Sequence, residues 1–385
     1  MEDYEEELEI ALKKKIQSLT EKTSQELENK INHIQEIIEQ KIKESFEVAN
    51  LQKNEICKNL LYHEMSLLDY ILICLSNMKP LVSLFLGNKQ KYLQQKINKI
   101  NKNNLFNLFV DLFNNLWFKK NNQYDAIEMH KYLNTLNKNI YYSKDPGQIM
   151  GFLLDKLNDE LKFNKNQNKE NIDVDRSQEL KAFENFKLVS KQNKTDISEM
   201  FSIIYKVIKT CNVCETKMYF FEKMLIVNLY IEEIRLSIVK EKKAFNEISL
   251  IDTFNFLLND NKDQEEFCKG CEYIQKMKIN NSIEDYDNDI LIININRDKD
   301  PNHIMNLAFK QTIQLLKKEK NYKYKLISVL NKNYEEKDQK VNLYCNNFNN
   351  NKWYLYNKNG VNLEEKEEEY LDGFKVLLLV YQRVY

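Results

Sequence analysis

The sequence has little glycine, proline and histidine, and almost no net charge. Its 385 residues include six glycines, three prolines and four histidines, and the formal net charge is −1. Because charges of both signs are spread along the chain, no overall field indicates nucleic acid or an anionic membrane as a partner. No apolar run approaches the ~20 residues of a membrane-spanning helix, and the acidic first residues argue against a signal peptide. We therefore expect an intracellular protein of the cytoplasm or nucleus that contacts no membrane.

Glycine and proline are absent from residues 1–55. This segment is rich in Glu, Lys, Gln and Ile, which are compatible with a long helix. Leu27, Ile31, Ile34 and Ile38 follow a spacing of four, three and four residues. Such a seam fits a partner-binding coiled coil and equally a helix packed on its own domain. We expect an N-terminal helix or coiled coil over 1–55, followed by one domain over 56–385.

Cysteine is also scarce, but its positions are informative. Four of the seven cysteines form two Cys-x-x-Cys pairs, in TCNVCETK and FCKGCEYIQK. Two such pairs can close a tetrahedral site around zinc, with sulfurs roughly 2.3 Å from the metal. The sequence predicts a structural Zn²⁺ site whose ligands are Cys211, Cys214, Cys268 and Cys271. An odd number of cysteines with paired thiols fits a reducing compartment better than a disulfide framework.

The pattern of elements changes along the chain. Residues 56–165 have helical patterns, and a polar stretch at about 163–195 is expected to be a loop or an insertion. From about 200 onward, runs typical of strands dominate, namely MLIVNLYI, DILIININ, YKLISVL, KWYLYN and VLLLVYQRV. Helices early and strands late predict an α+β protein.

Several segments carry a family resemblance when they are taken in order. They are LICLSNMKPLVSLFL, SKDPGQIMGFLLDKLNDELK, ISEMFSIIYKVIKTCNVC, SLIDTFNFLL, FCKGCEYIQKMKI, DILIININR, YKLISVLNK, KWYLYN and VLLLVYQRV. In this order they resemble the catalytic domain of ubiquitin-specific proteases, the papain-like deubiquitinases of peptidase family C19. The resemblance implies a helical thumb over about 56–165, zinc-ribbon fingers over about 200–285, and a β palm over about 286–385 with part of 165–200. It also implies that SLIDTFNFLL is the return strand of the fingers.

The catalytic positions of the family are degenerate here. The nucleophile position falls on Ser66 in HEMSLLDY, the position of the histidine base falls on Leu343 in VNLYCNNF, and the orienting residue falls on Asn357 after WYLY. A thiol protease needs a thiolate and an imidazole base within hydrogen-bond reach, and leucine cannot accept a proton. The resemblance therefore implies no catalytic residue at these three positions.

The supporting groups of the family site are also altered. Asn59 is two residues too far upstream for the side chain of the oxyanion hole. The Gln-Gln-Asp box keeps Asp145, and a charged segment, KNYEEKDQKVNLY, replaces the family's glycine-rich approach. None of the four histidines, His33, His63, His130 and His303, stands at the base position, and each is interpreted as a surface or structural residue.

The favoured hypothesis is a catalytically inactive ubiquitin-specific-protease-like protein. It would act as a binding or scaffold subunit of a larger intracellular assembly, with protein partners on the N-terminal helix and the domain surface. Ubiquitin binding and pure scaffolding stay open as alternative roles. The alternatives are an active deubiquitinating hydrolase, with Ser66 or Cys57 as nucleophile and His63 as base, and a zinc-binding α+β protein of another kind. An imidazole within about 4 Å of a thiol or hydroxyl in the thumb–palm groove would contradict the favoured hypothesis.

Overall fold

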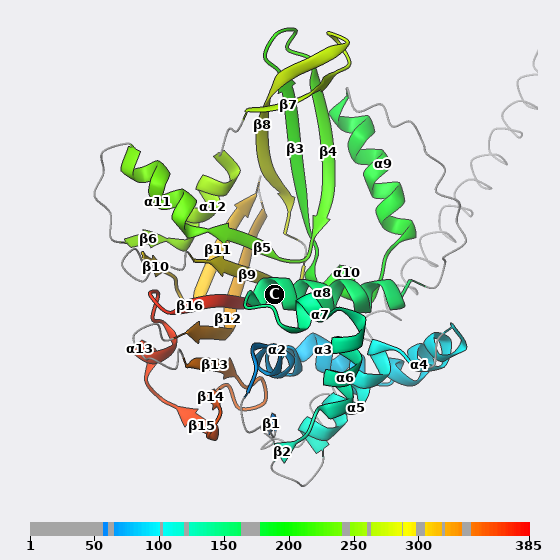
Figure 1. Cartoon of the computed structure of the whole chain (residues 1–385), viewed down its shortest axis with the longest axis vertical. Coiled ribbons are helices and arrows are strands. Elements are labelled where there is room, and N and C mark those ends of the chain that lie inside the picture. The colour runs from blue at the N-terminus through cyan, green and yellow to red at the C-terminus, as the bar shows by residue number, and fades with distance from the viewer. Residues whose placement is uncertain are drawn as a thin grey trace, which may run out of the picture. The chain divides into compact units, whose positions relative to one another are not determined.

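The computed structural model describes residues 57–60, 65–100, 103–118, 123–162, 178–240, 247–259, 263–286, 288–297, 305–317, 320–332 and 340–385. The chain divides after Lys53, and all described residues belong to the second unit, Asn54–Tyr385. The helix predicted for residues 1–55 lies outside the described residues. Helices precede strands along the chain, so the α+β prediction is confirmed (Figure 1).

The first part of the described chain is helical, and we call it the thumb. Its helices are α2 (Leu67–Ser76), α3 (Lys79–Leu86), α4 (Lys89–Ile100), α5 (Leu105–Phe118), α6 (Ile127–Leu136), α7 (Lys138–Tyr141) and α8 (Pro146–Glu160). Two short strands, β1 (Asn59–Leu60) and β2 (Gln123–Tyr124), pair in parallel beside them. No single helix in the described part of the chain has the length and apolarity to cross a membrane, while α2 and α3, bent by 79°, meet both criteria only as a pair.

Local sequence signals explain where the thumb helices begin. Ser66 and Asp69 form a reciprocal capping box at the start of α2, which satisfies two otherwise unpaired backbone groups. Pro80 lies in the first turn of α3, where its missing N–H costs nothing. The Asp145 side chain accepts hydrogen bonds from backbone N–H groups in the first turn of α8.

A four-stranded antiparallel sheet forms the part that we call the fingers. Its order is β4-β3-β8-β7, with β3 (Ile203–Cys211), β4 (Lys217–Met224), β7 (Asp263–Cys268) and β8 (Tyr273–Asp285). Helix α10 (Asp196–Phe201) leads into β3. The two Cys-x-x-Cys segments are the turns that connect β3 with β4 and β7 with β8, so both lie at the same end of the sheet (Figure 1).

Two sequence-based expectations for this region are wrong. Part of the expected loop at 163–195 is a helix, α9 (Glu179–Gln192), which lies beside β4. Aromatic side chains hold this helix against the fingers. The ring centroids of Phe183 and Phe186 lie 4.9 and 6.0 Å from that of Phe221 on β4. The segment SLIDTFNFLL is helix α12 (Leu250–Asn259), not a return strand, because Leu250 and Phe254 are buried at a helical spacing of four.

The largest sheet forms the part that we call the palm. Its order is β15-β14-β13-β12-β16-β9-β5, and β11 also pairs with β12. The strands are β5 (Val227–Tyr230), β9 (Ile290–Asn296), β11 (Thr312–Lys317), β12 (Lys320–Lys332), β13 (Val341–Asn346), β14 (Trp353–Asn357), β15 (Gly360–Glu364) and β16 (Val376–Val384). The pairs are antiparallel, except that β5 runs parallel to β9.

Smaller elements flank the palm. They are α11 (Ile231–Lys240), α13 (Glu367–Tyr370) and the parallel strands β6 (Glu247–Ser249) and β10 (Asn306–Ala308). The predicted strand runs DILIININ, YKLISVL, KWYLYN and VLLLVYQRV correspond to β9, β12, β14 and β16, which are confirmed. Strand β9 is buried from Ile290 to Ile295 and β16 from Val376 to Tyr381, in keeping with the apolar character of these segments.

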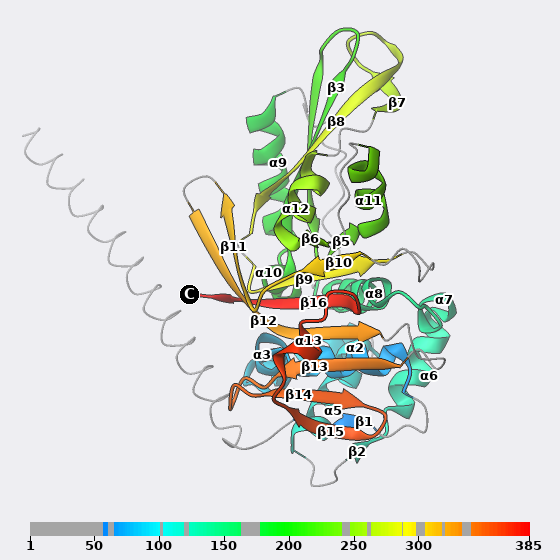
Figure 2. The same ribbon diagram turned by 90° about the vertical axis from the view of Figure 1, so that its left-hand side faces the viewer.

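Helix α2 joins the thumb to the palm. It is buried from Leu68 to Ser76 and lies alongside β13 (Figures 1 and 2). The indole of Trp117 donates a hydrogen bond of 2.9 Å to the carbonyl of Ser76. The hydroxyl of Tyr356, on β14, donates one of 2.9 Å to the carbonyl of Cys57. The first bond joins α5 to α2, the second joins β14 to the segment before β1, and both satisfy buried polar groups.

Candidate functional site

The four predicted metal ligands lie together at the end of the fingers. Their sulfur atoms all lie within 4.8 Å of one another. The Sγ atoms of Cys211 and Cys271 are 3.8 Å apart, and those of Cys214 and Cys268 are 3.4 Å apart. A tetrahedral metal with bonds of about 2.3 Å would place its sulfur ligands about 3.8 Å apart. The thiol cluster therefore has the size of a four-sulfur metal site.

The two turns that hold these thiols have the same backbone geometry. Glu215 and Glu272 each follow the second cysteine of a pair, with φ angles of 57° and 61°. Their N–H groups donate to the carbonyls of Cys211 and Cys268, at 3.1 and 2.8 Å. This left-handed residue closes each turn so that both thiols of a pair point to the same side.

Neighbouring groups shift the pKa values of the thiols in both directions, and the pKa of Cys271 is raised to about 12, chiefly by its hydrogen bond with Cys214. The Thr216 side chain lies 3.1 Å from Cys214 Sγ, and its hydrogen bonds are the main cause that lowers the pKa of Cys214 to about 6. A lowered pKa favours the thiolate, which is the form that binds a metal. Gly270 lets the second Cys-x-x-Cys turn pack closely against the first. A Cβ at residue 270 would lie 2.4 Å from Thr216 Oγ1 and 3.0 Å from Cys214 Sγ.

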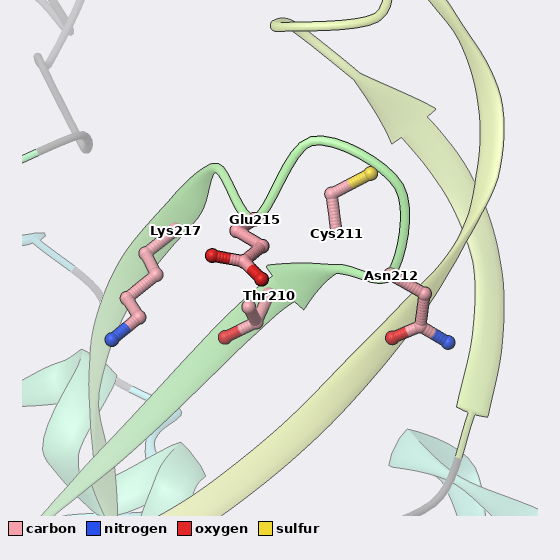
Figure 3. Close-up of a pocket in the computed structure, with 5 residues that line it drawn as sticks. All are labelled: Thr210, Cys211, Asn212, Glu215 and Lys217. Carbon is pink, nitrogen blue, oxygen red and sulfur yellow. The ribbon is translucent and has the colours of Figure 1, made fainter.

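A surface pocket lies next to the first of these turns. It is lined by Thr210, Cys211, Asn212, Glu215 and Lys217. In Figure 3 the sulfur of Cys211 points away from Glu215 and Lys217. Of these five residues only Cys211 belongs to the thiol cluster.

The nucleophile position shows a different arrangement. Ser66 is exposed at the start of α2, and its Oγ donates a hydrogen bond of 2.6 Å to Asp69 Oδ2. The backbone N–H of Ser66 donates to the same oxygen at 2.7 Å. The other oxygen of Asp69 lies 2.7 Å from His130 Nε2, and His130 Nδ1 lies 3.1 Å from the hydroxyl of Tyr141. Asp69 is fully buried and His130 is 5% exposed.

This network places an imidazole near a hydroxyl, but not in the groove between thumb and palm. Asp69, His130 and Tyr141 come from α2, α6 and α7, which all belong to the thumb. The carboxylate of Asp69 stands between Ser66 and the imidazole, so His130 does not face the serine as a base. His33, His63 and His303 lie outside the described residues.

Sequence reasoning missed this network. The Ser-x-x-Asp spacing before an apolar run is a recognisable helix-start signal. No local signal connects Asp69 with His130, which stands 61 residues further along the chain.

The base and orienting positions are occupied by residues with structural contacts. Leu343 is fully buried on β13 and pairs with Leu330 and Tyr356. The Asn357 side chain accepts a hydrogen bond of 2.8 Å from the N–H of Asn359 in the turn after β14. Neither side chain offers a proton acceptor for a hydroxyl on α2.

Asp145, the retained acid of the Gln-Gln-Asp box, connects the thumb to the palm. Besides capping α8, its carboxylate accepts a hydrogen bond of 3.1 Å from the buried side chain of Asn294, on β9. The backbone N–H of Gly147 donates a hydrogen bond of 3.2 Å to Oδ1 of Asn294. A Cβ on Gly147 would lie 2.3 Å from Asn294 Cγ, so the helix approaches β9 closely through its glycine.

The three remaining cysteines are all buried. Cys57, Cys74 and Cys345 are fully shielded from solvent, and burial raises the pKa of each thiol, to about 12 for Cys74. Cys345 Sγ accepts a hydrogen bond of 3.3 Å from Ser328 Oγ. Because the thiolate is the reactive form, Cys57 does not have the environment of an activated nucleophile.

Solved structures of a SAGA DUB module have a similar fold. The DUB module of Ubp8, Sgf11, Sus1 and Sgf73 from SAGA bound to monoubiquitin has a TM-score of 0.60 at 13% identity, over 86% of this chain and 69% of that chain. The same module bound to ubiquitin aldehyde has a TM-score of 0.57 at 12% identity, over 85% of this chain and 70% of that chain. A yeast SAGA DUB module with a mutant Sgf73 has a TM-score of 0.56 at 13% identity, over 86% of this chain and 69% of that chain. Identities this low show the fold alone.

The sequence itself matches a family model. No curated protein sequence matches the chain. The model of the ubiquitin carboxyl-terminal hydrolase family, however, matches residues 58–381, so the predicted resemblance to ubiquitin-specific proteases is confirmed. The chain belongs to the ubiquitin carboxyl-terminal hydrolase family.

Proposed function

We propose that this chain is a catalytically inactive member of its family and acts as a binding or scaffold subunit of a larger assembly. The observation that carries this proposal is the environment of Ser66. Its hydroxyl and its N–H both bind the carboxylate of Asp69, and the position of the histidine base holds the buried Leu343. A hydrolase of this type needs a base that removes a proton from the nucleophile.

We propose ubiquitin as one binding partner. The similar DUB modules have been solved with monoubiquitin and with ubiquitin aldehyde, which supports this choice. Those modules also contain further subunits, which supports a role for this chain in an assembly. Residues 1–55, with their coiled-coil spacing, are the segment that we propose for contact with such a protein partner, together with the surface of the domain over 56–385.

We propose zinc as the ion of the thiol cluster. Four sulfur donors at tetrahedral separations suit Zn²⁺ in structural sites, and such sites stabilise the fold without taking part in a reaction. A metal–thiolate site also supports the intracellular location expected from the sequence, because thiols stay reduced there.

Hydrolysis of a fluorogenic ubiquitin C-terminal amide tests the lack of activity. We expect the wild-type protein to release no more fluorophore than a Ser66→Ala, Cys57→Ala double variant. Release that the double variant loses would instead support the alternative function, an active deubiquitinating hydrolase with a displaced catalytic site.

A titration of labelled ubiquitin onto the full chain tests the binding role. Saturable binding supports a ubiquitin-binding subunit. No binding at high micromolar ubiquitin would leave scaffolding as the role. Co-purification of partners with the full chain and with a variant lacking residues 1–55 then tests whether this segment recruits them.

A further inference from the structure

The carboxylate of Asp69 contacts both polar groups of Ser66, the residue at the family's nucleophile position. Acyl transfer requires a free nucleophile and N–H donors aimed at the oxyanion that forms beside it. Here the Ser66 hydroxyl, at 2.6 Å, and the Ser66 N–H, at 2.7 Å, are both directed at one oxygen of Asp69. An ionised carboxylate at this point would repel a developing oxyanion and would also disfavour a thiolate at position 66.

The Asp69 side chain is held firmly in this position. It is fully buried, and its second oxygen lies 2.7 Å from His130 Nε2. His130 is itself buried, and its ring packs edge-on against Tyr141, with 5.7 Å between the ring centroids and an interplanar angle of 86°. The carboxylate thus has hydrogen-bonding partners on both oxygens and no solvent to turn towards.

We propose that Asp69 is the residue that closes position 66 to nucleophilic chemistry, and that His130 is the positioning residue that holds the carboxylate there. This inference rests on the proposed function, because it explains an inactive site. It adds that inactivity does not come from the missing thiol and base alone. A cysteine at position 66 would still stand next to a fixed negative charge.

Alkylation of a thiol placed at position 66 tests the role of Asp69. We would compare Ser66→Cys with Ser66→Cys/Asp69→Asn in the full chain. Iodoacetamide at pH 7.5 would react with each, and mass spectrometry of the peptide that contains residue 66 would give the rate. The thiolate sulfur displaces iodide, so the rate follows the thiolate fraction. We expect about tenfold faster reaction in the double variant, since a neighbouring carboxylate shifts a pKa by roughly one unit or more.

Equal rates in the two variants would overturn the inference. Ser66→Cys/Tyr141→Phe is the matched control, because it changes the outer end of the network and keeps the charge of Asp69. We expect it to react at the rate of Ser66→Cys. Fluorophore release by the wild-type protein would instead contradict the proposed function, so the two failures are distinguishable.

Hydrogen exchange tests the role of His130 without a new thiol. We expect His130→Ala to accelerate exchange at the amides of residues 67–70 about tenfold and to leave β3 in the fingers unchanged. His130→Gln, which keeps a donor, should restore part of the protection. Unchanged exchange at 67–70 in His130→Ala would show that His130 does not position Asp69.

Discussion

The thiol cluster in the fingers and the Ser66 network in the thumb are two polar sites built in opposite ways. In the fingers, four sulfur atoms converge within 4.8 Å, as a shared ligand requires. In the thumb, each polar atom of Ser66 and Asp69 is matched by another protein group. The first arrangement can hold a cation, and the second is hydrogen-bonded without a ligand.

The two regions also differ in their apolar support. The buried cluster at the end of the fingers consists of Cys211, Cys268 and Met277, with Met218 and Cys271 partly buried against it. Helix α2 is instead buried along its length between the thumb and the palm. A small apolar cluster cannot offset the entropy of ordering two turns, so we infer that the fingers depend on metal and the thumb does not.

Loss of one metal ligand should give the largest effect. Cys268→Ala removes a sulfur from the cluster, and zinc in such sites contributes roughly 10 kcal/mol of binding free energy. We expect the zinc content to fall below one ion per chain and β3, β4, β7 and β8 to lose protection from hydrogen exchange. Cys345→Ala is the matched control, since it truncates a buried thiol outside the cluster at about 1 kcal/mol and should keep the metal. Unchanged melting of the wild-type protein in a chelator would contradict a structural metal.

A second prediction concerns the close contact between α8 and β9. Gly147→Ala places a Cβ against Asn294, and we expect it to lower the free energy of unfolding by about 1–3 kcal/mol. Gly151→Ala, in the same helix, meets only Ile226 at an ordinary 3.5 Å, and should raise stability by about 0.5–1 kcal/mol. Denaturant unfolding of both variants checks the pair. Equal effects would show that the contact with Asn294 does not limit residue 147.

Ser66→Ala should have a smaller effect, of about 1 kcal/mol, because it removes the side-chain cap of α2. Ser66→Thr retains a capping hydroxyl and is expected to lie close to the wild-type protein in thermal melting. Neither change should alter zinc content, which separates the thumb from the fingers. A loss of zinc in Ser66→Ala would mean that the two sites are coupled.

Thiol reactivity gives the finest comparison. At pH 7.5, burial keeps Cys57, Cys74 and Cys345 protonated and shielded, so we expect no alkylation of the native protein at these residues. In metal-free protein, Cys214 should react, because removal of the metal leaves an exposed thiol without its ligand bond. Peptide mass spectrometry after brief treatment with iodoacetamide measures both. Fast labelling of Cys57 would revive it as a candidate nucleophile.

Much of the fold follows from local patterns. The apolar runs of β9, β12, β14 and β16 are long and flanked by polar residues, so they were recognisable as strands. The strand expected for SLIDTFNFLL came from the family resemblance, whereas the burial of Leu250 and Phe254, four residues apart, is typical of a helix. Helix α9 was not expected, because two of its phenylalanines pack on Phe221 of another element, and such a contact is not visible in the local sequence.

The sequence by itself determined which chemical groups this protein has at its key positions. Four thiols stand in two local pairs, and no imidazole stands at position 343. These facts are local, because a Cys-x-x-Cys turn or a strand residue is specified by neighbours along the chain. Only the tertiary structure decided that Asp69 meets His130, 61 residues away, while its other oxygen binds Ser66. Such a contact depends on how helices pack together, and packing is a property of the whole core rather than of any segment.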